Sequence, residues 1–76
     1  MNFVSNPVKN TFGLTEREME VLTLLVEGKS NPEISKEFVI TQNTAKAHVG
    51  SILLKMKVTN RVEAVVKAIK SGLVQI

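Results

Sequence analysis

Basic side chains without neighbouring acids mark the stretch from Thr41 to Lys57. It contains three lysines and the chain's single histidine, but no Asp or Glu. Such a set suits the binding of phosphates. His48 has no cysteine anywhere in the chain and no carboxylate nearby in sequence, so a metal or catalytic role is not expected, and we assign it a structural or phosphate-contacting role. The sequence holds no catalytic constellation, which predicts a protein that is not an enzyme and needs no cofactor.

The spacing of this stretch predicts a helix with two different faces. One face is apolar and consists of Ala45, Val49, Ile52, Leu53 and Met56. The opposite row consists of Asn43, Ala47, Gly50 and Leu54. Thr44 and Ser51 flank that row on one side, and Lys46 and Lys57 flank it on the other. Small side chains allow close approach to a DNA groove while lysines reach the phosphates. An ordinary solvated helix face is the alternative interpretation.

The charge of the chain is unevenly distributed. Residues 1–40 carry four Lys or Arg and six Glu, a net charge of −2, whereas residues 41–76 carry six Lys or Arg and one Glu, a net charge of +5. This asymmetry indicates a polyanion facing the second half. The basic stretch lacks the aromatic anchors of a membrane-surface helix, so nucleic acid is favoured over a membrane. No signal peptide or membrane-spanning run is apparent, and a cytoplasmic protein is expected.

A first helix is predicted between Thr15 and Gly28. Thr15 and Glu18 have the spacing of a capping box, and Gly28 can end the helix in the left-handed conformation. Glu18 falls within the apolar arc and therefore needs a cation or a hydrogen-bonding partner. We predict that this partner is Arg61, which starts the last helix. A capping residue with one face in water is the alternative.

The next two helices are short and closely joined. Ser30 or Asn31 caps the second, Pro32 occupies its first turn, and Thr41 caps the third after an apolar turn. This geometry is typical of a helix-turn-helix.

The fourth helix is predicted from Arg61 to Ser71, capped by Asn60 or Thr59 and closed by Gly72. Its apolar arc is wider than a core-facing stripe requires, which favours a partner surface. The predicted interface residues are Val62, Val66, Ile69 and Leu73. Alternatively, Val62 and Val66 are scattered surface residues or contact the N-terminal tail.

Residues 1–13 lack clear periodicity and are predicted to form a flexible lead-in or linker before a single domain, residues 14–76. Val4, Val8 and Phe12 can dock on that domain. The fold class is therefore all-α, with four helices.

Several spaced blocks of this sequence resemble one family. They are Leu14–Leu22, Gly28, Ser30–Ile34, Ile40–Thr41, Thr44–Val49, Ile52, Lys55–Met56, Val58, Arg61, Ala64–Val65, Ala68 and Gly72–Leu73. Together they resemble the LuxR-type helix-turn-helix domain of the NarL/FixJ response-regulator family. The resemblance implies a third helix in the major groove of double-stranded DNA, a homodimer through the fourth helix, and structural roles for Glu18, Leu22 and Gly28, to which the predicted pair adds Arg61.

The same resemblance places Lys46 and Ala47 where the family contacts base edges and the nearby DNA backbone. Asn43 faces the same side of the helix, by the helical wheel alone. Asn31, Thr44 and Lys55 are assigned to phosphates. The complete set of predicted DNA-binding residues is Asn31, Asn43, Thr44, Lys46, Ala47, His48, Gly50, Lys55 and Lys57. Three positions depart from the pattern of this family. Gly50 stands where relatives often carry a longer side chain that reaches into the groove. Leu54 stands where an outward polar residue is usual, and Ala45 stands where valine is commoner.

The leading interpretation is a sequence-specific, dimeric transcription regulator, either freestanding like the small regulators of this family or the output domain of a response regulator. A sigma-factor promoter-recognition region, with RNA polymerase as a second partner, is one alternative. A protein-interaction adaptor that has lost DNA binding is the other, and Gly50 and Leu54 favour it.

Overall fold

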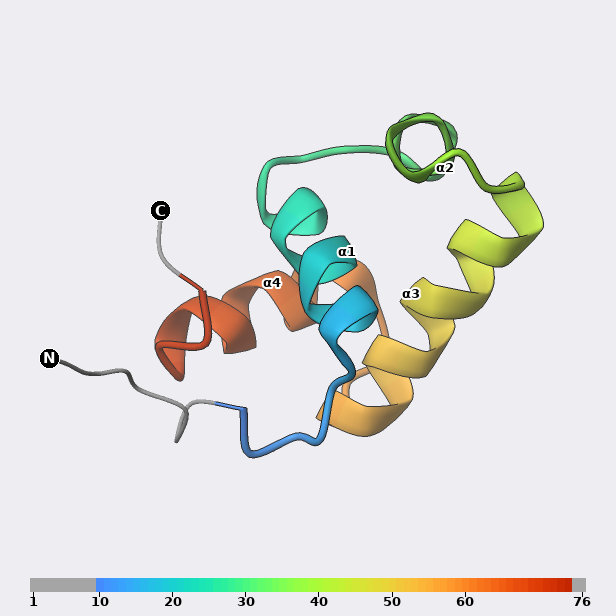
Figure 1. The fold of residues 1–76 in the computed structure, drawn as a ribbon. Coiled ribbons are helices and arrows are strands. Elements are labelled where there is room, and N and C mark those ends of the chain that lie inside the picture. The colour runs from blue at the N-terminus through green and yellow to red at the C-terminus, as the bar shows by residue number, and fades with distance from the viewer. Residues whose placement is uncertain (1–9, 75–76) are drawn as a thin grey trace, which may run out of the picture.

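Four helices and no strand make up residues 10–74, the part of the chain that the computed structural model describes (Figure 1). They are α1 (Glu16–Val26), α2 (Asn31–Phe38), α3 (Gln42–Met56) and α4 (Arg61–Lys70). The all-α, four-helix prediction is confirmed, and each helix begins within a residue or two of its predicted cap.

The start of α1 is the predicted capping box. The backbone N–H of Glu18 donates to Thr15 Oγ1 at 3.0 Å, and the backbone N–H of Thr15 donates to Glu18 Oε1 at 2.9 Å. Two free N–H groups at the helix start are thereby satisfied. Gly28, two residues beyond the last helical residue, has φ +87°, a conformation that glycine adopts without steric cost.

Ser30, not Asn31, caps α2. Its hydroxyl accepts from the backbone N–H of Glu33 at 3.3 Å, and Glu33 Oε1 accepts from the backbone N–H of Ser30 at 2.8 Å. The helix ends at Phe38, and its C-cap Val39 is a non-glycine residue with φ 54°. Thr41 then caps α3 by accepting from the N–H of Thr44 at 3.0 Å. The short, sharp turn between α2 and α3 gives the predicted helix-turn-helix.

Asn60 caps α4 by accepting from the N–H of Glu63 at 2.9 Å, while the Glu63 carboxylate accepts from the N–H of Thr59, also at 2.9 Å. Both residues proposed for this cap thus take part. Lys67 of α4 donates to the backbone oxygen of Met56 at 2.8 Å and so satisfies a free carbonyl at the end of α3.

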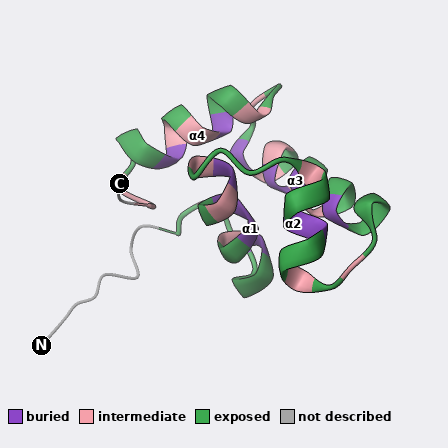
Figure 2. Cartoon of the chain, turned by 90° about the horizontal axis from the view of Figure 1, so that it is seen from above, coloured by how far each residue is buried: buried purple, intermediate pink, exposed green. Residues whose placement is uncertain are grey.

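The core is formed by the inward faces of all four helices (Figure 2). Its buried apolar residues are Leu14, Val21, Leu22, Leu25, Ile34, Ala45, Val49, Ile52, Met56, Ala64 and Ala68. Helix α3 packs on each of the other three helices. The predicted apolar face of α3 is therefore the centre of the domain, with Leu53 at its half-buried edge.

Residues 10–13 contact the domain directly. The side chain of Asn10 bonds both the backbone N–H and the backbone oxygen of Leu14, at 3.1 and 3.0 Å. Phe12 packs on the core as a half-buried residue. The rest of the predicted lead-in, including Val4 and Val8, lies outside the described residues. No helix within residues 10–74 combines the length and apolar character needed to cross a membrane.

Candidate nucleic-acid interface

The outward row of α3 (Asn43, Ala47, Gly50 and Leu54) is exposed along its whole length. Leu54 at its end is 79% exposed. Lys46 and Lys57, on one flank of this row, are also exposed, and His48 is half-buried. Helix α3 contains no acidic residue, so nothing on the helix itself neutralises these charges. The structure thus presents a small, basic, water-facing surface on the second helix of the helix-turn-helix.

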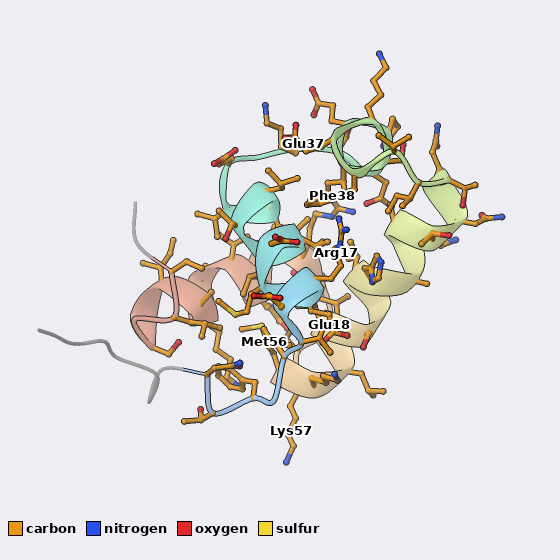
Figure 3. The ribbon with its side chains drawn as sticks, in the orientation of Figure 1. Arg17, Glu18, Glu37, Phe38, Met56 and Lys57 are labelled. Carbon is orange, nitrogen blue, oxygen red and sulfur yellow. The ribbon has the colours of Figure 1, made fainter. Side chains whose placement is uncertain are left out.

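On its other side, α3 is tied to α1 through Glu18. The Glu18 side chain is only 7% exposed and forms an ion pair with Lys55, whose Nζ lies 2.8 Å from Glu18 Oε1. The hydroxyl of Ser51 donates to Glu18 Oε2 at 2.6 Å. Figure 3 shows Glu18 pointing from α1 toward α3. The prediction that Glu18 needs a cation or a hydrogen-bonding partner is confirmed, and the prediction that this partner is Arg61 is wrong.

This environment determines the ionisation of Glu18. Burial by itself would raise its pKa. The hydrogen bonds from Lys55, Ser51 and the backbone of Thr15, together with the charge of Lys55, outweigh burial and lower the pKa from 4.5 to about 2. Glu18 is therefore a carboxylate at any physiological pH, and it holds α3 against α1 as an anion.

Lys55, predicted as a phosphate contact, makes two contacts within the domain. Besides Glu18, its Nζ donates to the backbone oxygen of Gly13 at 3.3 Å. The sequence pattern places Ser51 only on the flank of the outward row. Ser51 and Lys55 are four residues apart and lie on the same side of α3, a spacing that suits two donors to one carboxylate.

Arg61 binds the start of α2. Its Nη2 donates to Asn31 Oδ1 at 2.7 Å, and its Nη1 donates to the backbone oxygen of Lys29 at 3.3 Å. Since arginine has no acceptor, the amide oxygen of Asn31 must face Arg61, which leaves the NH₂ group of Asn31 to donate elsewhere. Asn31, predicted at a phosphate, is thus held in one amide orientation by α4.

Arg17 makes a contact that the sequence reasoning missed. Its guanidinium carbon lies 4.2 Å from the ring centre of Phe38, which joins α1 to α2 (Figure 3). Arg17 also forms an ion pair within α1, with its Nε 3.6 Å from Glu20 Oε1. Arginine over an aromatic ring is a recurrent stabilising contact, but no sequence pattern couples positions in two separate helices.

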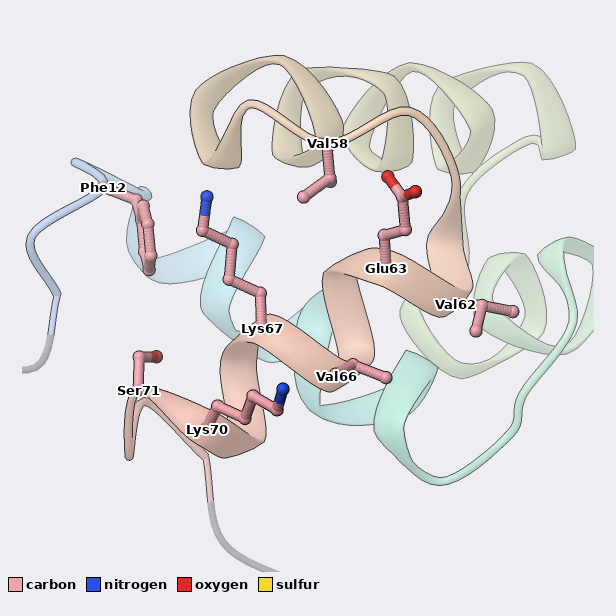
Figure 4. A pocket seen from close by; sticks show the side chains of 8 residues that line it. All are labelled: Phe12, Val58, Val62, Glu63, Val66, Lys67, Lys70 and Ser71. Carbon is pink, nitrogen blue, oxygen red and sulfur yellow. The ribbon is translucent and has the colours of Figure 1, made fainter.

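The outward side of α4 carries an open groove of about 540 Å³ (Figure 4). Its lining residues are Phe12, Val58, Val62, Glu63, Val66, Lys67, Lys70 and Ser71. Val62 is 68% and Val66 45% exposed, and Ile69 is exposed as well. Leu73 differs from these three predicted interface residues because it packs partly against the core. Phe12 lies beside Lys67, whose Nζ is 5.5 Å from its ring centre.

Among residues 10–74, no group of three or more His, Cys, Asp or Glu side chains is arranged to hold a metal ion.

Comparison with known proteins identifies the family. Residues 13–68 match the family described as bacterial regulatory proteins, luxR family. The chain is 48% identical over 62 residues to the response regulator protein VraR of Staphylococcus aureus, and equally to that of Staphylococcus epidermidis. These matches cover 82% of this chain and 30% of each relative. The chain therefore spans less than a third of the length of these curated relatives.

A solved structure agrees with this assignment. The response regulator ChrA of a heme-sensing two-component system superimposes with a TM-score of 0.77 at 34% identity, over 82% of this chain and 31% of that one. A family match across most of the chain and a shared four-helix fold lead to the same result. The chain belongs to the luxR family of bacterial regulatory proteins and has its DNA-binding helix-turn-helix fold.

Proposed function

We propose that this domain binds a specific DNA sequence by placing α3 in the major groove, and that it regulates transcription in doing so. The observation that carries the proposal is the outward row of α3, which is exposed and flanked by the exposed lysines Lys46 and Lys57 on a helix without acids. A groove-facing helix needs small side chains for approach and cations for phosphates.

Different residues serve base reading and phosphate binding in this proposal. Lys46 reaches guanine or a nearby phosphate, and Asn43 and Ala47 face base edges. Thr44, His48, Lys57 and the NH₂ group of Asn31 contact phosphates. Lys55 is not proposed to contact DNA, because its charge is neutralised by Glu18. Residues 14–76 form the DNA-binding unit, and residues 1–13 lead into it.

We also propose that two copies associate through α4 on a two-fold-related DNA site. The exposure of Val62, Val66 and Ile69 supports this, while Leu73 contributes only its exposed part. The 48% identical relatives are called response regulators, so an output domain in the cytoplasm is one setting, and a freestanding regulator is the other. RNA polymerase is a candidate partner in both.

The DNA-binding proposal is tested by selecting sites from random duplex DNA and then measuring affinity at several salt concentrations. Lys46→Ala should weaken binding to all DNA and relax selectivity at one position of each half-site, a loss of about 1–3 kcal/mol if a base contact disappears. Lys70→Ala removes the same charge from α4 and serves as the control on a DNA with one half-site, where association through α4 plays no part. Unchanged selectivity in Lys46→Ala would make Lys46 a backbone contact. A protein-interaction adaptor would show little salt-dependent affinity.

The dimer proposal is tested with Val66→Glu. Val66 is 45% exposed, so the domain should remain folded. A charge in an apolar interface should lower occupancy of a DNA with two half-sites far more than that of a DNA with one. Equal losses on both DNAs would remove the case for α4 as the interface.

A further inference from the structure

Leu54 is the large apolar side chain that α3 exposes most. It is 79% exposed, although the helix buries its other large apolar residues wholly or in part. It follows Ala47 and Gly50 in the outward row at spacings of seven and four residues, so all three lie along one side of the helix. Between Asn43 and the end of α3, this row contains no side chain that can form a hydrogen bond.

Gly50 has no reason within the domain to be glycine. A Cβ built at this position would meet no atom of residues 10–74 within 4 Å, and Gly50 is not among the residues with positive φ. Glycine is also one of the least favourable residues inside a helix. Neither packing nor backbone geometry requires it here, and the missing side chain leaves room for a surface outside this chain to come close to α3.

The major groove offers one apolar group to such a row. Each base pair presents donors and acceptors there, and only thymine adds a methyl group, on C5. The methyl of Ala47 and the isobutyl group of Leu54 cannot form a hydrogen bond with a donor or an acceptor, but they can pack on thymine methyls. The exposed lysines beside the row favour DNA over an apolar protein surface as its occupant.

We propose that Leu54, together with Ala47, reads thymine methyl groups, and that Gly50 lets α3 lie close enough to the base pairs for this contact. The inference rests on the proposed DNA binding and adds the chemistry of the site: the half-site contains thymines whose methyls, rather than their hydrogen-bonding edges, are recognised.

The experiment replaces each thymine of the selected site, one at a time, with uracil, which lacks only the methyl group. The wild-type domain should bind about fourfold more weakly for each contacted methyl that is removed. In Leu54→Ala the thymine-to-uracil ratio should fall to about one at one position and stay unchanged at the position that Ala47 contacts. Ala47→Gly should give the reverse pattern. Leu54 is mostly exposed, so these ratios can be measured on a folded variant.

Gly50→Ala supplies the second measurement. Its melting temperature should rise, because alanine favours the helix and the added Cβ meets nothing, yet its affinity for the selected site should fall about tenfold or more. Thr23→Ala, at an exposed position of α1, should improve the helix without changing DNA affinity.

The outcomes separate the two proposals. Failure to select any site would overturn DNA reading altogether. A selected site that tolerates uracil at every position, or a Leu54→Ala variant with the wild-type ratios, would overturn methyl reading alone and leave Leu54 to a protein partner. Wild-type affinity in Gly50→Ala would refute the close approach.

Discussion

Two polar contacts between helices, each centred on a charged residue, differ in burial and in what they hold. Glu18 joins α1 to α3 through Lys55 and Ser51, with its side chain 7% exposed. Arg61 joins α4 to α2 through an amide oxygen and a backbone oxygen, and it is half-exposed. In the first contact a buried anion meets a cation, whereas in the second a cation meets only neutral acceptors.

This difference separates stability from positioning. A nearly buried charge that loses its partner is costly, because the interior cannot solvate it. A half-exposed cation that loses neutral acceptors is hydrated by water instead. We therefore expect the Glu18 contact to determine how firmly the recognition helix is held, and the Arg61 contact to determine how Asn31 is oriented.

The largest expected effect is that of Glu18→Gln. Losing the carboxylate should lower the free energy of unfolding by about 2–4 kcal/mol, a large share of the roughly 4–10 kcal/mol expected for a domain of this size. Lys55→Met should cost less, since Ser51 and Thr15 still bond the carboxylate. Denaturant unfolding of both variants and the double variant measures their coupling.

The coupling energy between Glu18 and Lys55 should be about 1–2 kcal/mol, whereas a cycle of Glu18→Gln with Arg61→Met should be additive. Additive losses for Glu18 and Lys55 would mean that the ion pair contributes nothing and that Glu18 acts only as a helix cap.

Acidification should weaken the same contact without a mutation. The pKa of Glu18 is lowered from 4.5 to about 2, so its contribution is present above pH 4.5 and is lost as the pH falls toward 2. Complete protonation should cost about 3 kcal/mol. Glu33 and Glu63 have pKa values lowered by hydrogen bonds at their own helix starts and titrate in the same direction. The difference between wild type and Glu18→Gln across this range isolates Glu18. Parallel curves would contradict the lowered pKa.

The smallest effect is expected for Arg61→Met, about 0.5–1.5 kcal/mol of stability, as for ordinary hydrogen bonds at a partly exposed site. Arg61→Met should also lower the affinity for DNA. If Arg61 orients Asn31, losses of DNA affinity in Arg61→Met and Asn31→Ala should be less than additive, because either change frees or removes the same NH₂ group. Arg61→Lys, which keeps the charge but lacks the planar fork, is the control. Full additivity would separate Arg61 from DNA binding.

The helices were predictable because their ends are encoded locally. Thr15, Ser30, Thr41 and Asn60 each precede a helix and satisfy N–H groups within three residues, and Gly28 and Gly72 follow helix ends with positive φ. Such contacts depend on neighbours in sequence and not on how helices pack.

The partner of Glu18 was not predictable in this way. A helical wheel shows that Glu18 lies in the apolar arc of α1, but it does not show which residue of another helix faces it. That depends on how α1 and α3 are rotated and cross. The sequence assigns Lys55 to a phosphate because it carries a charge at the end of the helix, and it places Ser51 on the flank of the outward row. Both assignments concern α3 alone, whereas the contact is a property of the pair.

The central position of α3 also determines how the domain comes apart. Helix α3 packs on α1, α2 and α4, so it cannot detach without uncovering most of the core. Local opening that spares the rest of the fold is therefore confined to the ends of the other helices, and the inner amides of α3 should exchange hydrogen only through global unfolding. The slowest-exchanging amides would then belong to the same helix that carries the surface proposed to meet DNA. Helix α3 would be the most rigid part of the molecule.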